Sequence, residues 1–286
     1  MNAVRTPVLA GSWYPASPAD LGAEVAGYLA GADPSRRPAG RALIALAPHA
    51  GYTYSGPVAG RTLGLLAGDP PDRIVILAPN HRVAIDRLAL SGAGAYATPL
   101  GEVPVDTAAR DRLADLAPFA VDDRAHAHEH AIEIQLPFLQ SLWPDHDFSI
   151  LPLLVTRLAP DLRAEATAAL AELRDDRTLL LVSTDFTHFG ADYGYLPFRE
   201  DIPASLEKLD TGAILRVLGA DAEGLREYGD RTGITMCGLE AAALALETGL
   251  PGGYEAALID YARSADRDGD FSRSVSYAGV LVCTGS

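Results

Sequence analysis

Short runs of consecutive apolar residues alternate along the chain with longer segments in which apolar residues recur every three to four positions. The continuous runs are typical of buried strands, and the periodic segments are typical of amphipathic helices. Strands are predicted at residues 41–49, 73–79, 148–155, 177–186, 254–264 and 274–284. Two shorter strands, at 87–92 and 101–106, are predicted to form a hairpin-like excursion. Helices are predicted at residues 56–68, 105–117, 129–143 (interrupted or bent at Pro137), 160–174, 201–218, 221–228 and 236–248.

Strands that are apolar on both faces need a sheet that is covered on both sides. Their alternation with helices predicts an α/β fold, a three-layer α/β/α sandwich around a mostly parallel or mixed sheet. No low-complexity tract or repeat of solenoid length interrupts the pattern, and the 286 residues contain 48% hydrophobic side chains. We therefore expect one domain over residues 1–286.

The net charge of −15 limits the classes of possible partners. Binding to phosphate groups needs a concentration of Lys and Arg, so neither nucleic acid nor an anionic membrane surface is an expected partner. The first twenty residues lack the apolar core of a signal peptide, and no apolar run approaches the length of a membrane span. Cys237 and Cys283 are too few for a disulfide framework. We expect a cytoplasmic protein.

Polar residues of catalytic type follow three of the predicted strands. The first strand ends at His49, the second is followed by His81, and the fourth runs into "STDFTH", which supplies Asp185 and His188. A single histidine after a strand is commonly a hydrogen-bonded structural residue. Because ligands in open α/β sheets bind beyond the carboxyl ends of the strands, three such endings predict a shared site.

Two neutral imidazoles are good ligands for iron, zinc, copper or nickel. Asp185 or Cys237 would supply a third ligand. Cys237 lies in "GITMCGLEAAALAL", where a glycine-flanked turn opens a helix, and a thiol at a helix N-terminus has a lowered pKa. It is therefore a candidate thiolate ligand or nucleophile, and the alternative is a small buried apolar residue.

The segment "RAHAHEHAIEIQLPF" adds further titratable residues at a predicted helix start. Glu129 and Glu133 share a helix face, with a solvated helix start as the alternative interpretation. Aromatic residues near the strand ends either line a cleft or pack in the core. We assign five residues to substrate binding: Trp13, Tyr14, Tyr54, Glu129 and His130.

Seven motifs, taken together and in this order, resemble the Memo family, which includes the AmmeMemoRadiSam system protein B. They are "AGSWYP", "APHAGYTYSG", "PNH", "EHAIEIQLPFL", "STDFTHFG", "MCG" and "SVSYAG". The resemblance implies a fold like that of class III extradiol dioxygenases, which are non-haem iron enzymes. It also implies metal ligands at His49, His81 and Cys237, with Asp185 and His188 as the catalytic pair. A radical-SAM enzyme and an AMMECR-like protein are the implied partners.

The chain departs from the family pattern at Asn80 and Arg82, where many relatives have serine and a second histidine. A thiolate ligand also differs from the two histidines and one carboxylate of the ring-cleaving enzymes, so ring cleavage does not follow from the fold. Two functions are therefore expected. The first is a redox enzyme that uses Fe(II), or alternatively Cu or Zn, on a small or peptide-borne aromatic substrate. The second is a peptide- or phosphopeptide-binding or metal-handling module without turnover.

Overall fold

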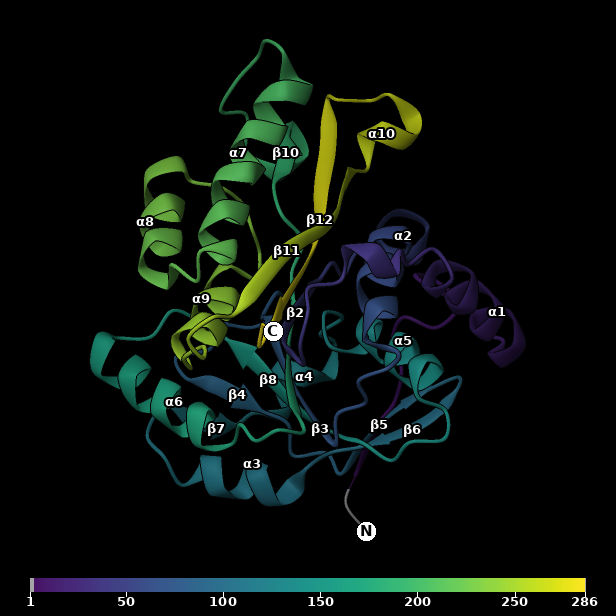
Figure 1. The fold of residues 1–286 in the computed structure, drawn as a ribbon, viewed down its shortest axis with the longest axis vertical. Helices are drawn as coiled ribbons and strands as arrows, with labels where there is room; N and C mark the ends of the chain where they lie inside the picture. Colours follow the sequence, from purple (N-terminus) through teal and green to yellow (C-terminus); the bar gives the residue numbers. More distant parts are fainter. Residues whose placement is uncertain (1–2, 286) are drawn as a thin grey trace.

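The computed structural model describes residues 3–285 and contains one large and one small β-sheet (Figure 1). Within these residues the large sheet has nine strands in the order β10-β12-β2-β9-β3-β8-β4-β7, and β11 pairs with β12. Its strands are β2 (Ala42–Ala47), β3 (Arg73–Pro79), β4 (Leu88–Leu90), β7 (Phe119–Val121), β8 (Ser149–Val155), β9 (Thr178–Ser183), β10 (His188–Gly190), β11 (Glu255–Arg263) and β12 (Arg273–Cys283). The small sheet is formed by β1 (Val4–Arg5), β5 (Ala95–Thr98) and β6 (Gly101–Pro104).

The centre of the large sheet is parallel. Strands β2, β9, β3 and β8 run in one direction, and Val75 on β3 lies level with Leu180 on β9 and Leu151 on β8. Antiparallel partners, β12 beside β2 and β4 beside β8, flank this parallel core. The predicted mixed sheet is confirmed, and the carboxyl ends of the four central strands meet at one edge.

Helices cover both faces of this sheet, because its strands bury alternate side chains on opposite sides. On β3, Ile74 and Ile76 join one hydrophobic cluster while Val75 and Leu77 join the other. The first cluster contains side chains of α1 (Pro18–Leu29), α2 (Tyr52–Leu63) and α5 (Leu136–Leu142). The second contains side chains of α3 (Thr107–Ala114), α6 (Pro160–Glu172), α7 (Ile202–Leu218), α8 (Ala222–Thr232) and α9 (Leu239–Glu247). The remaining helices are α4 (Asp123–Ala127), α10 (Ala265–Asp268) and the 3₁₀ turns η1 (Pro34–Arg36), η2 (Gly64–Leu66), η3 (Glu133–Gln135) and η4 (Ala191–Tyr193).

The predicted helix over 129–143 is confirmed only in its second half, as α5, and is wrong for its first residues. The chain forms α4 before it, leaves 128–132 irregular, and resumes as η3 and then α5. The buried carboxylate of Glu129 folds back to accept hydrogen bonds from the backbone N–H groups of His130 and Ala131, and this local bonding accompanies the irregular backbone at 128–132. Pro137 lies at the start of α5, where proline is tolerated, rather than at a bend.

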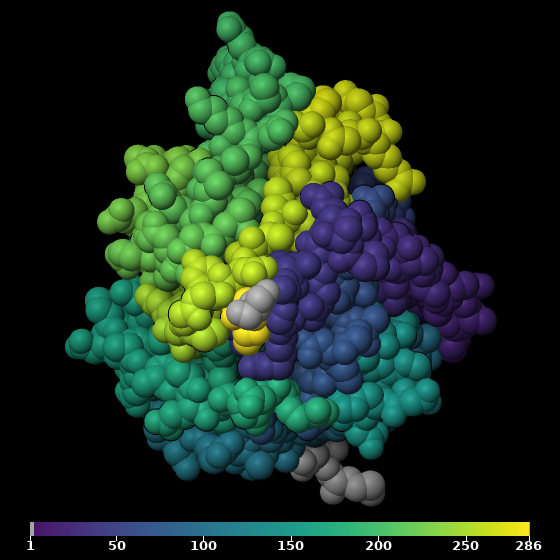
Figure 2. Space-filling model, in the orientation of Figure 1, coloured from purple at the N-terminus to yellow at the C-terminus, as the bar shows by residue number. Residues whose placement is uncertain are grey.

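The predicted hairpin-like excursion is also wrong, since β4 joins the large sheet and β6 pairs with β5 in the small one. The C-terminal hairpin of β11 and β12, with α10 at its tip, projects from the same end of the molecule as the segment that leads into α7 (Figures 1 and 2). Across residues 3–285, no helix is both long enough and apolar enough to cross a membrane.

Candidate metal centre

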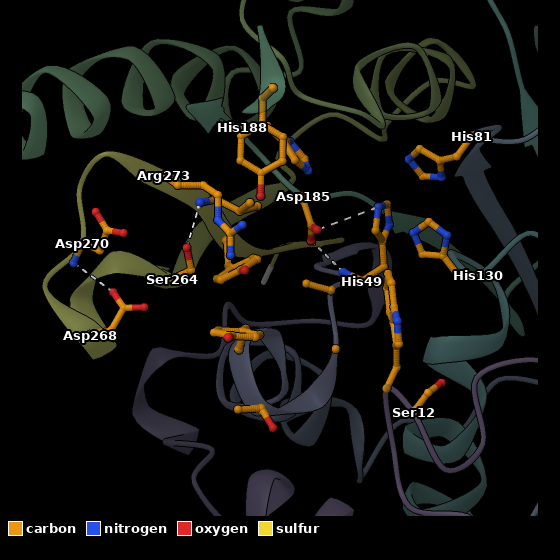
Figure 3. Close-up of a pocket in the computed structure, with 18 residues that line it drawn as sticks. Ser12, His49, His81, His130, Asp185, His188, Ser264, Asp268, Asp270 and Arg273 are labelled. Carbon is orange, nitrogen blue, oxygen red and sulfur yellow. Dashed lines mark hydrogen bonds and ion pairs between the residues drawn. The ribbon is translucent and has the colours of Figure 1, made fainter. Parts of the chain in front are cut away.

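The residues that follow the central strands line one cavity of about 560 Å³. His49 lies two residues after β2, His81 two residues after β3, and Asp185 two residues after β9. His188 is the first residue of β10 and lines the same cavity. The structure therefore brings together the polar residues that follow the three predicted strands (Figure 3).

A third imidazole joins the first two. His130 comes from the irregular segment between α4 and α5. One ring nitrogen from each of His49, His81 and His130 lies within 4.8 Å of the other two. The ring centroids of His49 and His130 are 5.3 Å apart, and the rings of His81 and His130 stack at 4.5 Å. His130, predicted to bind substrate, is thus placed where a metal ligand would be, and this group of three histidines can hold a metal ion.

Hydrogen bonds define which nitrogen of His49 is free. The Ser183 hydroxyl donates to the carbonyl of Ala131 at 2.6 Å and accepts from Gln135 Nε2 at 2.9 Å. Because its single proton is used, Ser183 must accept the bond from His49 Nδ1, 3.0 Å away. His49 therefore carries its proton on Nδ1, and Nε2 is left with a lone pair for a metal.

Glu129 sets the tautomer of His81 in the same way. Its carboxylate, 1% exposed, accepts from the backbone N–H of His81 at 2.7 Å and from His81 Nδ1 at 2.9 Å. It also accepts the N–H groups of His130 and Ala131. Sequence analysis assigned Glu129 to substrate binding. The structure instead places it behind the histidines, outside the cavity lining, as the group that orients His81.

Burial keeps His49 and His130 neutral. It lowers the pKa of His49 to about 3, with a further contribution from His81, and it lowers the pKa of His130 as well. The Nδ1 atom of His130 lies 3.2 Å from Glu129 Oε1 but outside hydrogen-bond geometry, so among residues 3–285 it has no partner. A neutral ring that is not fixed by a structural bond at this nitrogen is suited to metal binding.

Cys237 lies beside the three histidines. Its Sγ atom is 3.2 Å from His49 Nε2 and accepts the backbone N–H of Asp185 at 3.1 Å. Two acceptors lie within reach of the thiol proton: His49 Nε2, which has a lone pair, and the carbonyl of Asp185, 3.4 Å from Sγ. Burial, followed by the nearby Asp185, raises the pKa of Cys237, so the lowered pKa predicted from its place before α9 is wrong.

Asp185 and His188, the catalytic pair that the resemblance implies, have separate hydrogen-bond partners. Asp185 Oδ1 accepts the backbone N–H of His49 at 2.7 Å, and burial raises the pKa of the Asp185 carboxyl. The His188 ring instead places Nδ1 near two carbonyls, 3.0 Å from Phe186 and 3.2 Å from Thr235. Asp185 therefore holds the backbone of His49, whereas backbone carbonyls hold the His188 ring.

The aromatic residues divide between cavity and core. Trp13 and Tyr54 line the cavity, and the Trp13 ring lies 4.7 Å from that of His130. Tyr14, which was also assigned to substrate binding, is 3% exposed and donates its hydroxyl to Glu133 at 2.6 Å. It belongs to the core. Tyr193, which sequence analysis did not select, lines the cavity instead.

The end of the cavity opposite the histidines is polar and mainly acidic (Figure 3). Asp268 and Asp270, from α10 and the loop after it, line this end together with Arg273. Arg273 is itself paired with Asp192 at 3.4 Å. The cavity therefore combines a histidine end, aromatic walls and an acidic mouth.

Comparison with known proteins places this arrangement in a family. The family profile described as "Memo-like protein" matches residues 5–281. The chain belongs to the Memo family. A MEMO1 family protein from Methanopyrus kandleri is 35% identical over 98% of this chain and 99% of its own length, and one from Thermococcus kodakarensis is 34% identical over 97% and 99%. A further MEMO1 family protein, from Aquifex aeolicus, is 31% identical over 97% of this chain and 98% of its own.

The Memo match contains every residue of the candidate metal centre, since it extends over almost the whole chain. Among solved structures, an uncharacterized protein from Escherichia coli K12 aligns with a TM-score of 0.54 and 18% identity. The alignment covers 84% of this chain and 99% of that protein. This likeness supports the α/β fold of the Memo chain.

Proposed function

We propose that this protein is a metal-dependent oxidoreductase, dioxygenase-like and dependent on Fe(II), that acts on an aromatic substrate. The observation that carries the proposal is the cavity itself. It joins three imidazoles at one end with His188, a further histidine that is not part of the three-histidine group. Metal ligands and a separate acid/base group in one cavity are the parts that such chemistry requires.

The donor set fits iron and also suits copper or zinc. We propose His49, His81 and His130 as imidazole ligands and Cys237 as a thiolate ligand beside them. His49 Nε2 and Cys237 Sγ are 3.2 Å apart, close to the roughly 3.5 Å that separates nitrogen and sulfur ligands of one tetrahedral ion. When bound, Fe(II) supplies Lewis acidity and one-electron redox chemistry.

His188 is the proposed general acid/base. Its Nδ1 faces only carbonyl acceptors and so carries the proton, which leaves Nε2 to accept a proton from a substrate hydroxyl. Trp13 packs beside His130 and limits water at the histidine end. Asp185 holds the backbone of His49 and stays inside the protein, 3% exposed.

The cavity favours a substrate larger than a single ring. Its volume of about 560 Å³ is in the range that accommodates drug-sized ligands, and Trp13, Tyr54 and Tyr193 give it aromatic walls. Asp268 and Asp270 at the mouth repel anions, so a phosphorylated ligand is disfavoured. A small or peptide-borne aromatic substrate without phosphate is what we propose.

The test is anaerobic loading with Fe(II), followed by oxygen-uptake assays with a panel of catechols and aromatic peptides. We expect metal-dependent uptake with at least one class. His188→Gln should keep metal content and lower turnover by roughly two to four orders of magnitude, the scale for losing an acid/base group. His146→Gln is the matched control, because His146 bonds the carbonyl of Pro71 away from the cavity.

A different outcome would support the binding-module alternative. If the wild type consumes no oxygen with any substrate, while an aromatic peptide binds in the cavity whether or not metal is present, the enzyme proposal fails. Loss of metal from His188→Gln would also contradict the assigned role, because a group that only moves protons does not hold the ion.

A further inference from the structure

Two segments that carry site residues are joined by side-chain hydrogen bonds rather than by a strand ladder. One runs from Thr184 to His188 and the other from Thr235 to Gly238. The N–H of Gly238 donates to Thr184 Oγ1 at 3.0 Å, and the N–H of Asp185 donates to Cys237 Sγ at 3.1 Å. The third connection is between Thr235 and His188.

Thr235 contacts His188 at three points. Its hydroxyl accepts the backbone N–H of His188 at 2.7 Å and donates to the backbone carbonyl of His188 at 3.0 Å. Its own carbonyl lies 3.2 Å from His188 Nδ1. One residue thus satisfies both backbone groups of His188 and contacts its ring, so the position of the ring depends on Thr235.

These contacts decide the tautomer. Carbonyl oxygens only accept hydrogen bonds, so a ring nitrogen between Phe186 O and Thr235 O must carry a proton. We propose that Thr235 is the positioning residue of His188: it holds the ring as the Nδ1–H tautomer and keeps Nε2 available to the cavity. This inference rests on the proposed function, in which His188 moves a proton.

Thr187, the residue before His188, is held by a different side chain. Asp210 of α7, fully buried, accepts the N–H of Thr187 at 3.1 Å and its hydroxyl at 2.6 Å. Asp210 therefore fixes the residue before His188, whereas Thr235 bonds His188 itself. Removing the Thr235 hydroxyl should therefore move the His188 ring while Asp210 still holds Thr187. A substitution at Thr235 thus tests the position of His188 alone.

The experiment compares Thr235→Val, Thr235→Ser and the control Thr62→Val, a buried threonine of α2 whose hydroxyl bonds the carbonyl of Val58 within the same helix. In ¹⁵N-histidine NMR of the metal-free protein, the two tautomers give distinct signals, and His188→Gln assigns those of His188. We expect wild type and Thr235→Ser to show the Nδ1–H form. Thr235→Val should show a mixture of forms, because its His188 backbone groups lose their hydroxyl partner. Thr62→Val should match wild type.

Metal content and turnover complete the test. Thr235 does not belong to the three-histidine group, so Thr235→Val should bind the same amount of Zn²⁺ as wild type. If a substrate is found, its turnover should fall roughly 100-fold, the scale for a displaced catalytic group, and Thr235→Ser should recover most of it.

Two results would overturn the inference: His188 signals in folded Thr235→Val that equal those of wild type, or a failure of Thr235→Ser to restore them. If Thr235→Val does not fold, the wild-type signals still decide, since a dominant Nε2–H form contradicts the proposal. The NMR readout needs neither metal nor substrate, so it can succeed while the proposed function fails, or the reverse.

Discussion

The thiol proton of Cys237 is the atom that metal binding must displace. In the metal-free protein the thiol lies 3.2 Å from His49 Nε2 and 3.4 Å from the carbonyl of Asp185, and burial holds the pKa of Cys237 above its usual range. The pKa of His49 is lowered to about 3, so this imidazole releases no proton at neutral pH. A metal that takes both atoms must therefore expel the thiol proton into the buffer.

We expect about one proton to be released per Zn²⁺ bound between pH 7 and 9, and metal affinity to rise with pH across this range. The sign follows from Cys237, which is protonated in the metal-free state and deprotonated in the bound state. Calorimetric titrations in buffers of different ionisation enthalpy count the proton, and Cys237→Ser should abolish the release. Full stoichiometry with no proton released would instead assign the site to the three histidines alone.

Glu129 carries a second prediction at the residue scale. Glu129→Gln keeps the shape of the side chain but replaces an acceptor oxygen with an NH₂ group that faces N–H donors, so His81 loses its orienting bond. Metal affinity should fall about 10- to 100-fold, the usual cost of losing such a partner. Equilibrium dialysis with Zn²⁺ measures it, with exposed Glu102→Gln as control. An unchanged affinity in a folded variant would show that Glu129 does not orient His81.

The residues that could be predicted from sequence are those that the sheet itself places. His49, His81, Asp185 and His188 follow central strands, so the general rule for parallel sheets predicts their convergence. Three other contributors come from irregular segments that are brought in by long-range contacts, and no periodicity marks them: Glu129 behind His81, His130, and Thr235 at His188. Ser183 is the last residue of β9, and only the folded structure shows that it bonds His49.

At the scale of elements, the N-terminal segment is held against the metal centre by one buried carboxylate. Glu133 of η3, fully buried, accepts the backbone N–H groups of Val8 and Leu9, each within 3.0 Å. It also forms an ion pair with Arg5 of β1 and accepts the hydroxyl of Tyr14. The segment between these anchors contains Trp13, so Glu133 determines where the wall beside His130 lies.

Glu133→Gln should loosen this segment. Removing the charge leaves Arg5 buried and unpaired, a change that costs about 3–5 kcal/mol in other buried pairs. We expect urea unfolding to show a loss of this order and hydrogen exchange to rise at residues 8–14. Glu24→Gln, which removes only a partly exposed bond to Tyr28, should lose less than about 1.5 kcal/mol. Equal losses in the two variants would contradict the anchoring role.

Elements were predictable where burial alone determines them. The run at 73–79 became β3 within the same bounds, because a strand covered on both faces needs apolar residues throughout. The segment 129–143 has helical periodicity, yet its first residues give their N–H groups to the side chain of Glu129. The small sheet also escaped prediction, since β1 pairs with β5, which is about 90 residues away in the chain and only four residues long.

At the scale of the whole molecule, the metal centre brings together four segments that lie far apart in the sequence. His49 follows β2, His81 follows β3, His130 precedes η3, and Cys237 precedes α9. A bound ion would link all four segments in the native state, while in the unfolded chain these residues are far apart. Metal should therefore bind the folded protein in strong preference to the unfolded one.

This preference predicts that metal raises thermal stability. At a free Zn²⁺ concentration 100 times the Kd, mass action adds about 2.7 kcal/mol to the free energy of unfolding. For a chain of this size that corresponds to an increase of roughly 5 °C in Tm. Scanning calorimetry of metal-free and Zn²⁺-loaded protein measures the shift, and chelation should reverse it.

His49→Ala is the decisive comparison, because it removes the ligand at the centre of the group, which neighbours His81, His130 and Cys237. It should bind little metal and show almost no shift, while His146→Gln should shift like wild type. If His49→Ala gained as much stability from Zn²⁺ as the wild type does, the ion would bind elsewhere and the assigned centre would be wrong.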